Sequence, residues 1–374
     1  MKQASYPKHP SHPNHNMALI MAAGTGGHIM PGLAIALGLR DMGWQVEWLG
    51  TTHGMENKLV PAQQLTLHSV AFKGLRGKGA LGMVKGVFQG TLALIQSVQL
   101  MRSIKPRVVV GMGGYICLPG AWAAKLCGVP LVLVNADADL LLSNQSLASM
   151  AHTVCCGFAG SAAQLPNAVV TGNPVRASIT TLPNYEKRTS RALLNTTPLN
   201  LLVMGGSLGA QVINQIIPQA IAAMPLAKRP HLLHQAGAAN AAQVKKTYDD
   251  LGVTATVVPF IDDVAQALAT ADMVIGRAGA ITVSELAVAG LPSILIPFVA
   301  STTAHQTGNA SYLAEQGATI HLPQNKLTVK SLLDILNALN RSSLVAMSAA
   351  VKRLAKPNAT QAVIRRIVTA SQSK

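Results

Sequence analysis

The sequence predicts an α/β protein made of two doubly wound parallel-sheet domains. Short apolar runs alternate with helical patterns through almost the whole chain, as in parallel sheets covered by helices on both faces. The succession of strand, glycine turn and helix occurs near residue 22 and again at residues 201–214 (LLVMGGSLGAQVIN). A chain of 374 residues, 49% of them hydrophobic, is long enough to bury two ordinary cores.

The apolar runs predict the strands. In the first half of the chain they cover residues 19–22, 46–49, 67–70, 108–111, 131–134 and 153–156. In the second half they cover residues 201–204, 232–235, 256–258, 273–275, 294–296 and 319–322. Proline and polar residues interrupt the alternation at 169–186, which predicts the boundary between the domains. Doubly wound sheets bind ligands beyond the carboxyl ends of their strands, so the cleft between the two sheets is the expected active site.

Two apolar segments imitate membrane-directed sequences. Residues 17–23 (MALIMAA) follow a basic tail, as a signal peptide would, but the run is short and opens into a glycine turn, so we expect a first strand. Residues 286–304 are uncharged, yet Pro292 and Pro297 divide them into a helix end, a strand and a loop. The tail itself, residues 1–16, contains several histidines but is expected to be disordered rather than to bind a metal.

The charge balance predicts an anionic partner. Thirty Lys and Arg residues against fourteen Asp and Glu residues give a net charge of +16, which suits a nucleic acid, a phospholipid surface or a phosphorylated substrate. Aromatic residues make up only 3% of the chain, and no basic, aromatic-studded motif is present, so no nucleic-acid partner is expected. The four cysteines show no C-x-x-C spacing, which indicates a reducing compartment.

The stretch AAGTGGHIMPGLAIA, residues 22–36, predicts a tight strand-to-helix turn whose bare backbone can approach a phosphate. Its spacing matches neither common phosphate-binding motif. A dinucleotide fingerprint would need glycine where Ile29 stands, and a Walker loop would need lysine where His28 stands. A turn without any ligand is the alternative interpretation.

Eight motifs occur in the order of one known family. They are GTGGHIMPGLAIA (24–36), GLRGKG (74–79), VVVGMGGYICLPG (108–120), TGNPVR (171–176), GGSLGA (205–210), FIDDV (260–264), GRAGAITVSELAVAGLP (276–292) and HQTGNA (305–310). Together they resemble the MurG family, and the resemblance runs from about Ala18 to the C-terminus. It implies an inverting, metal-independent glycosyltransferase without a cofactor. Such an enzyme moves GlcNAc from UDP-GlcNAc to undecaprenyl-diphospho-N-acetylmuramoyl-pentapeptide (lipid I), forming lipid II for peptidoglycan.

The resemblance also implies the GT-B fold, two facing Rossmann-like domains with an interdomain cleft. Residues 17–172 are expected to form the acceptor- and membrane-binding domain. Residues from about 357 to 374 are expected to belong to the same domain, because in the family the last helix crosses back to the first domain. Residues 173–356 are expected to form the UDP-GlcNAc-binding domain. The implied location is the cytoplasmic face of the bacterial inner membrane, with peripheral attachment and with cell-wall or division proteins as further partners.

The resemblance assigns donor contacts to residues in both halves of the chain. The matching positions are Thr25, Gly26, Gly27, Asp137, Arg176, Ser207, Ile261, Ala280, Ile281, Thr282, Val283, Ser284, Glu285 and Gln306. Glu285 is the only charge in AITVSELAVAG and can accept hydrogen bonds from both ribose hydroxyls, the alternative being an ordinary helix charge. Ser207 precedes a helix and suits the α-phosphate. Ile261 would offer its backbone to uracil, and Gln306 would bind sugar hydroxyls or remain a polar loop residue.

Two residues are expected on the acceptor side. His28, at the start of a helix, would act as the base for the acceptor hydroxyl or stabilise charge, the alternative being a structural helix cap. Tyr115, in GMGGY, resembles the other acceptor-side residue of the family. These two are the candidate catalytic residues.

The sequence departs from the family pattern at one important place. Where the family has His-Glu-Gln-Asn, this chain has VNAD, residues 134–137. Asp137 thus replaces a neutral amide that contacts the donor sugar; it can still accept hydrogen bonds but adds a negative charge near the diphosphate. Leu208 and Ala278 are smaller departures from Gln and Ser, and the triplet DAD is interpreted as a coincidence rather than a metal site. The alternative function is therefore a catalytically weak or acceptor-shifted UDP-GlcNAc-binding protein at the membrane.

Residues 72–88 mix basic and apolar side chains, which suits an anionic phospholipid surface. The basic members are Lys73, Arg76, Lys78 and Lys85, and the apolar members are Phe72, Leu75, Leu81, Met83 and Phe88. An amphipathic helix packed on the core is the alternative interpretation.

Overall fold

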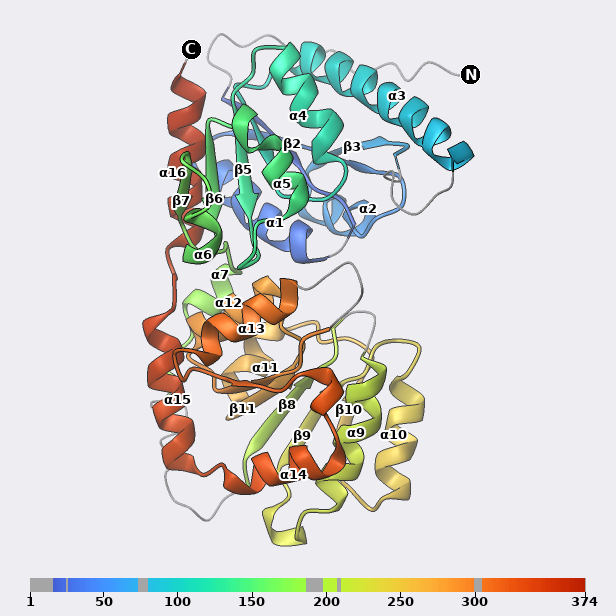
Figure 1. Ribbon diagram of the computed structural model, residues 1–374, viewed down its shortest axis with the longest axis vertical. Helices are drawn as coiled ribbons and strands as arrows, with labels where there is room; N and C mark the ends of the chain where they lie inside the picture. Colours follow the sequence, from blue (N-terminus) through green and yellow to red (C-terminus); the bar gives the residue numbers. More distant parts are fainter. Residues whose placement is uncertain are drawn as a thin grey trace. The chain divides into compact units, whose positions relative to one another are not determined.

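The computed structural model describes residues 16–24, 26–72, 80–185, 198–206, 210–298 and 305–373, without the side chains of residues 80–85 and 87. The described residues form two compact units (Figure 1). Unit 1 contains the residues up to Arg176 and those from Asn358 onward, and unit 2 contains Ala177–Pro357.

Unit 1 is built on a parallel sheet of seven described strands in the order β3-β2-β1-β4-β5-β6-β7. The strands are β1 (Met17–Met21), β2 (Gln45–Thr51), β3 (Thr66–Val70), β4 (Val108–Gly111), β5 (Leu131–Asn135), β6 (Thr153–Cys156) and β7 (Ala168–Val170). Residues 17–21 are thus the expected first strand. The edge strand β7 falls where the sequence predicted a break in the pattern, and its Val169 pairs with Cys155 of β6.

Helices cover both faces of this sheet, because alternate residues of a strand point to opposite sides. They are α1 (Gly26–Asp41), α2 (Glu56–Leu59), α3 (Ala80–Ile104), α4 (Cys117–Leu126), α5 (Leu142–Leu147), α6 (Ala159–Ala162) and α16 (Ala359–Gln372), with short 3-10 turns at Pro61–Gln63 and Ala148–Met150. Ile20 of β1 faces the core shared with α1 and α16, whereas Leu19 and Met21 face the core shared with α3 and α4.

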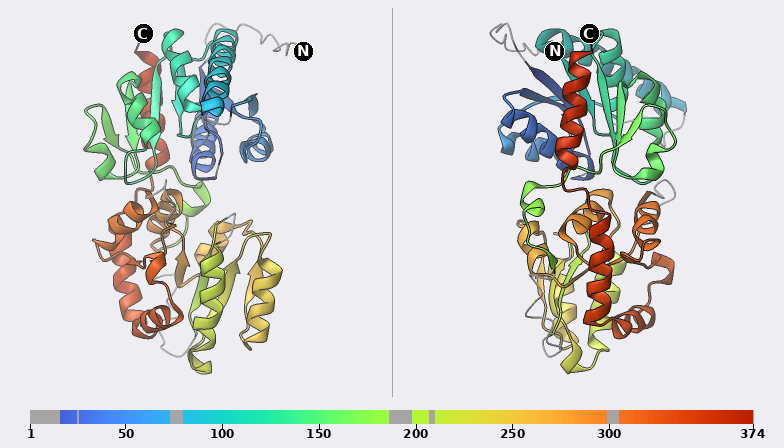
Figure 2. Two further views of the ribbon diagram at one scale, coloured as in Figure 1. Left: turned by 45° about the vertical axis from the view of Figure 1, so that its right-hand side comes forward. Right: turned by 90° about the vertical axis from the view of Figure 1, so that its left-hand side faces the viewer.

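The last helix packs on unit 1. Helix α16 lies alongside the sheet of unit 1 (Figure 2). Its residues Val363, Ile364 and Ile367 are buried in the same core as α1. A Cβ at Gly38 of α1 would meet the end of the Ile364 side chain, so this glycine lets the two helices approach each other closely. Unit 1 is therefore assembled from two segments that lie far apart in the sequence.

Unit 2 repeats the design with six described strands in the order β10-β9-β8-β11-β12-β13, again all parallel. The strands are β8 (Asn200–Met204), β9 (His231–Gln235), β10 (Thr256–Val258), β11 (Met273–Gly276), β12 (Ser293–Leu295) and β13 (Ile320–His321). The helices are α7 (Ala177–Thr180), α9 (Gln211–Ala222), α10 (Ala241–Asp250), α11 (Val264–Thr270), α12 (Ala280–Ala289), α13 (His305–Ala314), α14 (Val329–Ala338) and α15 (Arg341–Arg353), with 3-10 turns at Leu226–Lys228 and Gln324–Lys326.

The uncharged segment 286–304 divides as expected. Helix α12 ends at Ala289 and is followed by Gly290, whose φ of +67° is a left-handed conformation that favours glycine. Strand β12 follows, and residues 299–304 lie outside the described part of the chain. Within that part, every helix is too short or too polar to cross a bilayer.

A buried histidine joins three elements of unit 2. His234 of β9 lies with Nδ1 2.9 Å from the Tyr248 hydroxyl and Nε2 3.1 Å from Oδ1 of Asn214. The Asn214 amide nitrogen donates to the carbonyl of Ala236, so its oxygen is the atom that faces the ring. Nε2 therefore carries the proton, and Tyr248 donates to Nδ1. Burial lowers the pKa of His234 to about 4, because a charged ring would lose its solvation.

We expect His234 to make unit 2 less stable in mild acid. Its pKa is about 4 in the folded chain against 6.5 for the free side chain, so the unfolded chain binds the proton first. The contribution of the neutral His234 side chain to the free energy of unfolding is fully present above pH 6.5. It is lost as the pH falls towards 4, and the loss is about 3 kcal/mol in total. Thermal denaturation across this range should show the loss in the wild type and in His231→Gln, which changes an exposed histidine of the same strand. His234→Gln should show a smaller loss, and equal pH dependence in all three proteins would contradict this assignment.

Candidate active site

Each sheet has one place where the chain order of its strands reverses. It lies between β1 and β4 in unit 1 and between β8 and β11 in unit 2. At such a switch point the adjoining loops part and open a crevice beyond the carboxyl ends of the strands, where doubly wound sheets bind ligands. Glycine-rich segments follow all four strands, at residues 22–27, 112–116, 205–210 and 276–279. The glycine motifs therefore mark the switch point of each unit.

The strands that flank each switch point approach closely at their ends. The amide of Met112 donates to the carbonyl of Met21 (2.9 Å), and the amide of Arg277 donates to the carbonyl of Met204 (3.4 Å). A Cβ at Gly276 would lie 2.9 Å from that Met204 oxygen, so only glycine fits there without movement. The two loops of each pair consequently begin side by side.

His28 lies in the first turn of α1 and packs against the second glycine turn of unit 1. A Cβ at Gly113 would lie 3.0 Å from both Cδ2 and Nε2 of the ring and 3.6 Å from Leu141, which follows β5. Gly113 and Gly114 also have φ of +101° and +84°, which disfavour any side chain. The glycines thus leave room for the imidazole. Because the ring is held in place and partly exposed, it can take a proton from a substrate hydroxyl.

Tyr115 follows the same glycine turn and is 39% exposed. Its ring meets that of Phe72 edge to face, with centroids 5.8 Å apart. Phe72 is itself buried, so its expected place on a membrane-facing surface is wrong. The physical reason is that Phe72 packs in the core beneath α3 and α4, where its ring also supports Tyr115.

The segment VNAD is a structured loop built around Asn135. This fully buried side chain donates through Nδ2 to the carbonyls of Asp137 (2.9 Å) and Asp139 (3.1 Å). Its Oδ1 accepts from the amide of Leu141 (3.0 Å) and from Asn144 of α5 (3.1 Å). Only an amide side chain can both donate and accept in this way. The backbone of Asp137 is therefore fixed beyond the end of β5, with a partly exposed side chain.

Arg176 ends the stretch TGNPVR in unit 1 and is partly exposed. Asn173 of this stretch is buried and donates to the carbonyl of Ala136 (2.8 Å). A Cβ at Gly157 would overlap the Asn173 side chain, which explains the glycine. The fold thus attaches the stretch that carries Arg176 to the loop that carries Asp137.

Helix α12 carries six of the expected donor contacts in one run, Ala280 to Glu285. Gly279 precedes the helix and supplies no side-chain cap. The first amides of the helix can therefore donate hydrogen bonds to a bound anion. Glu285 is only 3% exposed, so a ligand can reach its carboxylate only by a narrow approach. Val283 is buried, and the Ser284 hydroxyl donates to the carbonyl of Ala280 (2.8 Å).

Gln306 lies in the first turn of α13, and its Oε1 accepts from the amide of Phe298 (2.9 Å). Arg277 approaches the same loop: its Nη1 donates to the carbonyls of Ile296 (3.1 Å) and Pro297 (3.3 Å), and its guanidinium lies over the Phe298 ring. Burial lowers the pKa of Arg277. Arg277 is the one charge in the motif GRAGA, but its place at this loop was not predicted from the sequence.

Five other expected contacts are less defined. Ile261 follows β10 with a buried side chain, so only its backbone can meet a ligand. Thr25 and Ser207 lie outside the described residues, as does Leu208. Gly26 and Gly27 begin α1 and are partly or fully exposed. Among the described residues, no cluster of three or more His, Cys, Asp or Glu side chains could hold a metal ion.

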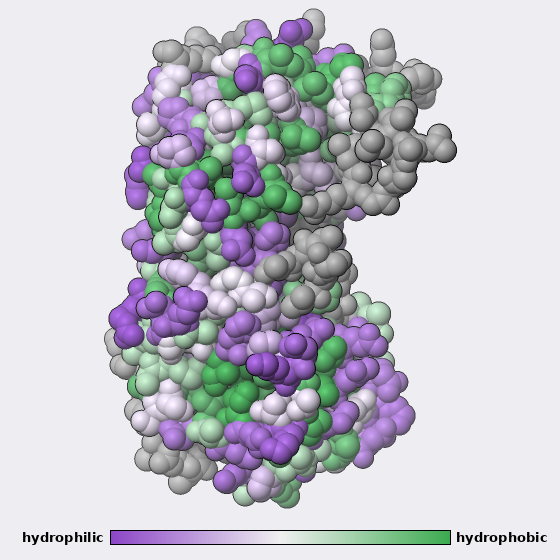
Figure 3. All heavy atoms as spheres, viewed as in Figure 1, coloured by the Kyte–Doolittle hydropathy of each residue, from purple (hydrophilic) through white to green (hydrophobic). Residues whose placement is uncertain are grey.

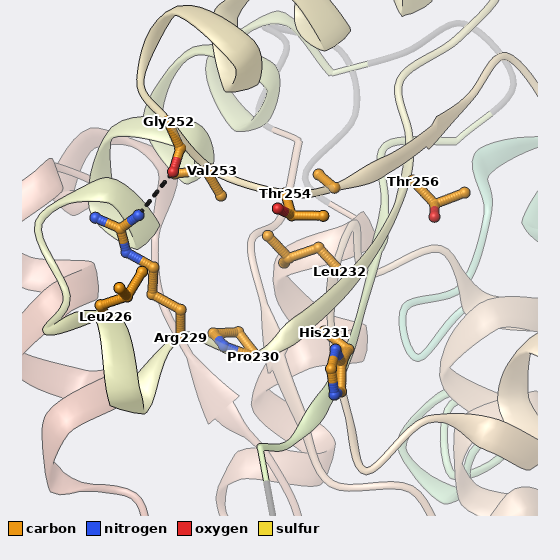
Figure 4. A pocket seen from close by; sticks show the side chains of 10 residues that line it. Leu226, Arg229, Pro230, His231, Leu232, Gly252, Val253, Thr254 and Thr256 are labelled. Atoms are coloured by element: carbon orange, nitrogen blue, oxygen red, sulfur yellow. Dashed lines mark hydrogen bonds between the residues drawn. The ribbon is translucent and has the colours of Figure 1, made fainter.

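A surface pocket of unit 2 lies away from these turns, at the amino ends of β9 and β10 (Figure 4). Arg229 is the one arginine or lysine among its described lining residues, and all three guanidinium nitrogens donate to carbonyls. Nη1 donates to Gly252 (2.9 Å), Nη2 to Ala222 (2.7 Å) and Nε to Met224 (3.2 Å). The guanidinium thus caps the ends of α9 and α10 rather than pointing at a ligand.

Comparisons with known proteins match both units to one class of enzyme. Residues 18–156 match the glycosyltransferase family 28 N-terminal domain, and residues 200–363 match the family 28 C-terminal domain. A relative from Chromobacterium violaceum is 50% identical over 91% of this chain and 94% of its own length. Another, from Methylibium petroleiphilum, is 48% identical over 92% and 95%. Both are named UDP-N-acetylglucosamine–N-acetylmuramyl-(pentapeptide) pyrophosphoryl-undecaprenol N-acetylglucosamine transferase.

A solved structure agrees with these relatives. The crystal structure of MurG from Acinetobacter baumannii has a TM-score of 0.80 and 33% identity, covering 95% of this chain and 99% of the other. The two sheets and the two matched domains define a glycosyltransferase of family 28, with the GT-B fold that the sequence predicted. Within that class, the chain belongs to the MurG family.

Proposed function

We propose that this chain transfers GlcNAc from UDP-GlcNAc to lipid I, forming lipid II for peptidoglycan synthesis. The observation that carries the proposal is the match over nine-tenths of the chain to relatives named for this reaction. Glycine turns at both switch points support it. A direct test measures UDP release by the purified protein, which should require lipid I as well as UDP-GlcNAc. Release that is independent of lipid I would contradict the proposal.

The donor is bound mainly by unit 2 in this proposal. The uncapped start of α12 and the glycine-rich segment that contains Ser207 bind the phosphates, because helix amides and their dipole favour an anion. Glu285 accepts hydrogen bonds from the ribose hydroxyls, and the backbone of Ile261 meets uracil. Gln306 binds sugar hydroxyls through its amide nitrogen, since Phe298 already donates to its oxygen.

Unit 1 supplies the base in this proposal. His28 takes the proton of the acceptor hydroxyl as the oxygen forms its bond to the anomeric carbon of GlcNAc. The bond from that carbon to the diphosphate breaks on the opposite side, UDP leaves with the electron pair, and the configuration inverts. Gly26 and Gly27 offer amides near the diphosphate, while Tyr115 lines the acceptor side. In this proposal the reaction needs no metal, because Arg176 and the amide donors stabilise the leaving group.

We expect Asp137→Asn to lower the KM for UDP-GlcNAc about fivefold and to raise turnover. The substitution removes a negative charge whose repulsion of the donor diphosphate costs about 1 kcal/mol. The Asn135 hydrogen bonds to the backbone should hold the loop in place. Steady-state kinetics check this, with Asp139→Asn, an exposed carboxylate of the same loop, as the control. A large fall in turnover at unchanged donor affinity would instead identify Asp137 as a base.

An exposed apolar surface of unit 1 suits a membrane. Phe88, Leu92 and Ile95 lie on one face of α3, and Leu118, Trp122 and Leu126 lie on one face of α4, which packs against α3. Hydrophobic side chains gather over this part of the molecule in the space-filling view (Figure 3). Lys125 lies over the Trp122 ring.

We propose that this α3–α4 surface attaches the enzyme peripherally to the cytoplasmic face of the inner membrane, beside its lipid-linked acceptor. Phe88 belongs to the basic and apolar stretch that the sequence singled out. Lys73, Arg76 and Lys78 of that stretch lie outside the described residues, and the side chain of Lys85 is not described. These lysines and this arginine would add attraction to anionic lipid. Cell-wall or division proteins remain expected partners.

Replacing Trp122 and Leu126 together with glutamine should weaken binding to vesicles that contain anionic phospholipid by about tenfold or more, because insertion of half-exposed apolar side chains is worth about 1 kcal/mol each. Vesicle co-sedimentation measures the effect. Leu226→Gln, at an exposed apolar position of unit 2, is the matched control and should bind as the wild type does. Equal binding of all three proteins would exclude the α3–α4 surface.

A further inference from the structure

A buried carboxylate connects the first glycine turn to the loop after β2. Glu56, the first residue of α2, is 0% exposed. Its Oε2 accepts from the amide of Gly24 (3.1 Å), while its Oε1 accepts from the amide (2.9 Å) and the hydroxyl (2.7 Å) of Thr51. One side chain thus satisfies donors on the first glycine turn and at the end of β2, which are separate in the sequence.

The neighbouring residues leave space for this carboxylate and for little else. A Cβ at Gly54 would overlap the Glu56 carboxyl group, and a Cβ at Gly50 would lie 2.8 Å from its Cγ. The amide of Met55 also donates to the carbonyl of Gly24 (3.3 Å). Gly24 is therefore held through both its amide and its carbonyl, at a φ of +99°.

The start of the turn is fixed from the same side. The indole Nε1 of Trp48 donates to the carbonyl of Ala22 (2.9 Å), and the amide of Ala22 donates to the carbonyl of Leu49 (3.2 Å). Beyond Gly24 the chain enters α1, where Gly26, Gly27 and His28 are at least partly exposed. The last described attachments before these exposed residues are those at Gly24, made by the carboxylate of Glu56 and by the amide of Met55.

We propose that Glu56 is a positioning residue for glycosyl transfer. Its carboxylate holds Gly24 so that the amides of Gly26 and Gly27 and the imidazole of His28 are already arranged when the substrates arrive. Glu56 is completely buried, so it acts through the turn and does not touch a substrate. This inference rests on the proposed function, because it assigns the turn to the transfer step.

Two variants disturb this contact in different ways. Glu56→Gln keeps the shape of the side chain but replaces one acceptor oxygen by a donor, so either Gly24 or Thr51 loses its partner. Gly54→Ala keeps the carboxylate and pushes it away from Gly24. Glu47→Gln is the matched control, since Glu47 is another buried carboxylate of unit 1 and pairs with His68 (2.6 Å) on β3, away from the turn.

Hydrogen exchange and kinetics test the proposal together in the full chain. In Glu56→Gln and Gly54→Ala, amides of residues 22–28 should exchange about tenfold faster than in the wild type, because a hydrogen bond to a charged acceptor is lost. Turnover should fall about a hundredfold, because even a small misplacement of reacting groups can slow a reaction by this factor. The thermal shift produced by UDP should be retained. Glu47→Gln should keep wild-type exchange in this segment and wild-type turnover, even where its melting temperature falls.

The outcomes separate the inference from the proposed function. Unchanged exchange in residues 22–28 of the variants, or a turnover no lower than that of Glu47→Gln, would overturn the role of Glu56. If Glu56→Gln does not fold, Gly54→Ala decides by the same two measurements. If the wild type itself transfers no GlcNAc, the proposed function fails together with the kinetic role, whereas the exchange data still decide whether Glu56 holds the turn.

Discussion

Replacing His28 with glutamine is expected to lower turnover by about two to four orders of magnitude, the usual worth of a positioned general base. Glutamine can occupy the space beside Gly113 and Gly114 and can form a hydrogen bond, but it cannot accept the proton of the acceptor hydroxyl at neutral pH. Binding of UDP should stay close to the wild-type value, because its contacts are proposed mainly on unit 2. Steady-state kinetics with saturating donor and acceptor measure the effect.

His53→Gln provides the control for this experiment. His53 is an exposed histidine of unit 1 that lies on the loop after β2, so its loss should leave turnover unchanged. If His28→Gln keeps more than about a tenth of the wild-type turnover, His28 is a helix cap or a charge stabiliser rather than the base.

The second large effect is expected at Glu285. Glu285→Gln should weaken UDP binding at least about a hundredfold, because two hydrogen bonds from the ribose to a charged acceptor are worth about 1.5–3 kcal/mol each. The substitution keeps the volume of a side chain that is 3% exposed, so the fold of α12 should survive. Calorimetric titration with UDP gives the dissociation constant, and the thermal shift produced by UDP should largely disappear.

Glu315→Gln is the matched control, since Glu315 is an exposed carboxylate of unit 2. It should bind UDP as the wild type does. A Glu285→Gln variant with the wild-type thermal shift would show that this carboxylate serves the packing of α12 and not the donor.

The sequence alone predicts most of the fold, because parallel strands buried on both faces are continuous apolar runs. It missed β7, whose three residues lie at a sheet edge and are partly exposed, so they give too short a pattern to be recognised. It predicted β13 as four residues, whereas only Ile320 and His321 pair. The extent and register of a short edge strand depend on the strand with which it pairs, and the sequence of the edge strand alone does not reveal that pairing.

The parts of the candidate site that the sequence predicted are the glycine-rich turns, because the spacing of glycines reflects the local conformation of the backbone. The contact of His28 with Gly113 was not predictable, because it requires β1 and β4 to pair (Ala18 with Val108), which is a property of the sheet order and not of either motif. The strand order follows from the fold as a whole. The sequence therefore supplied both partners of this contact without showing that they meet.

Buried polar side chains were the other omission. Glu56 stands in a polar stretch, TTHGMENK, where nothing marks it as buried. Asn135 was noticed only as a departure from the family, whereas the structure shows that it organises the loop after β5. Such residues are recognised by the donors around them, and those donors come from segments that the chain brings together only on folding.

The most direct test of the central claim follows the sugar itself. The full chain is incubated with UDP-GlcNAc labelled in the sugar and with lipid I, and the lipid product is analysed by mass spectrometry. We predict that lipid I gains one labelled N-acetylhexosamine, that one UDP is released for each sugar transferred, and that a metal chelator does not reduce the rate. Label that stays in UDP-GlcNAc, or that is released as free sugar while lipid I is unchanged, would contradict the account.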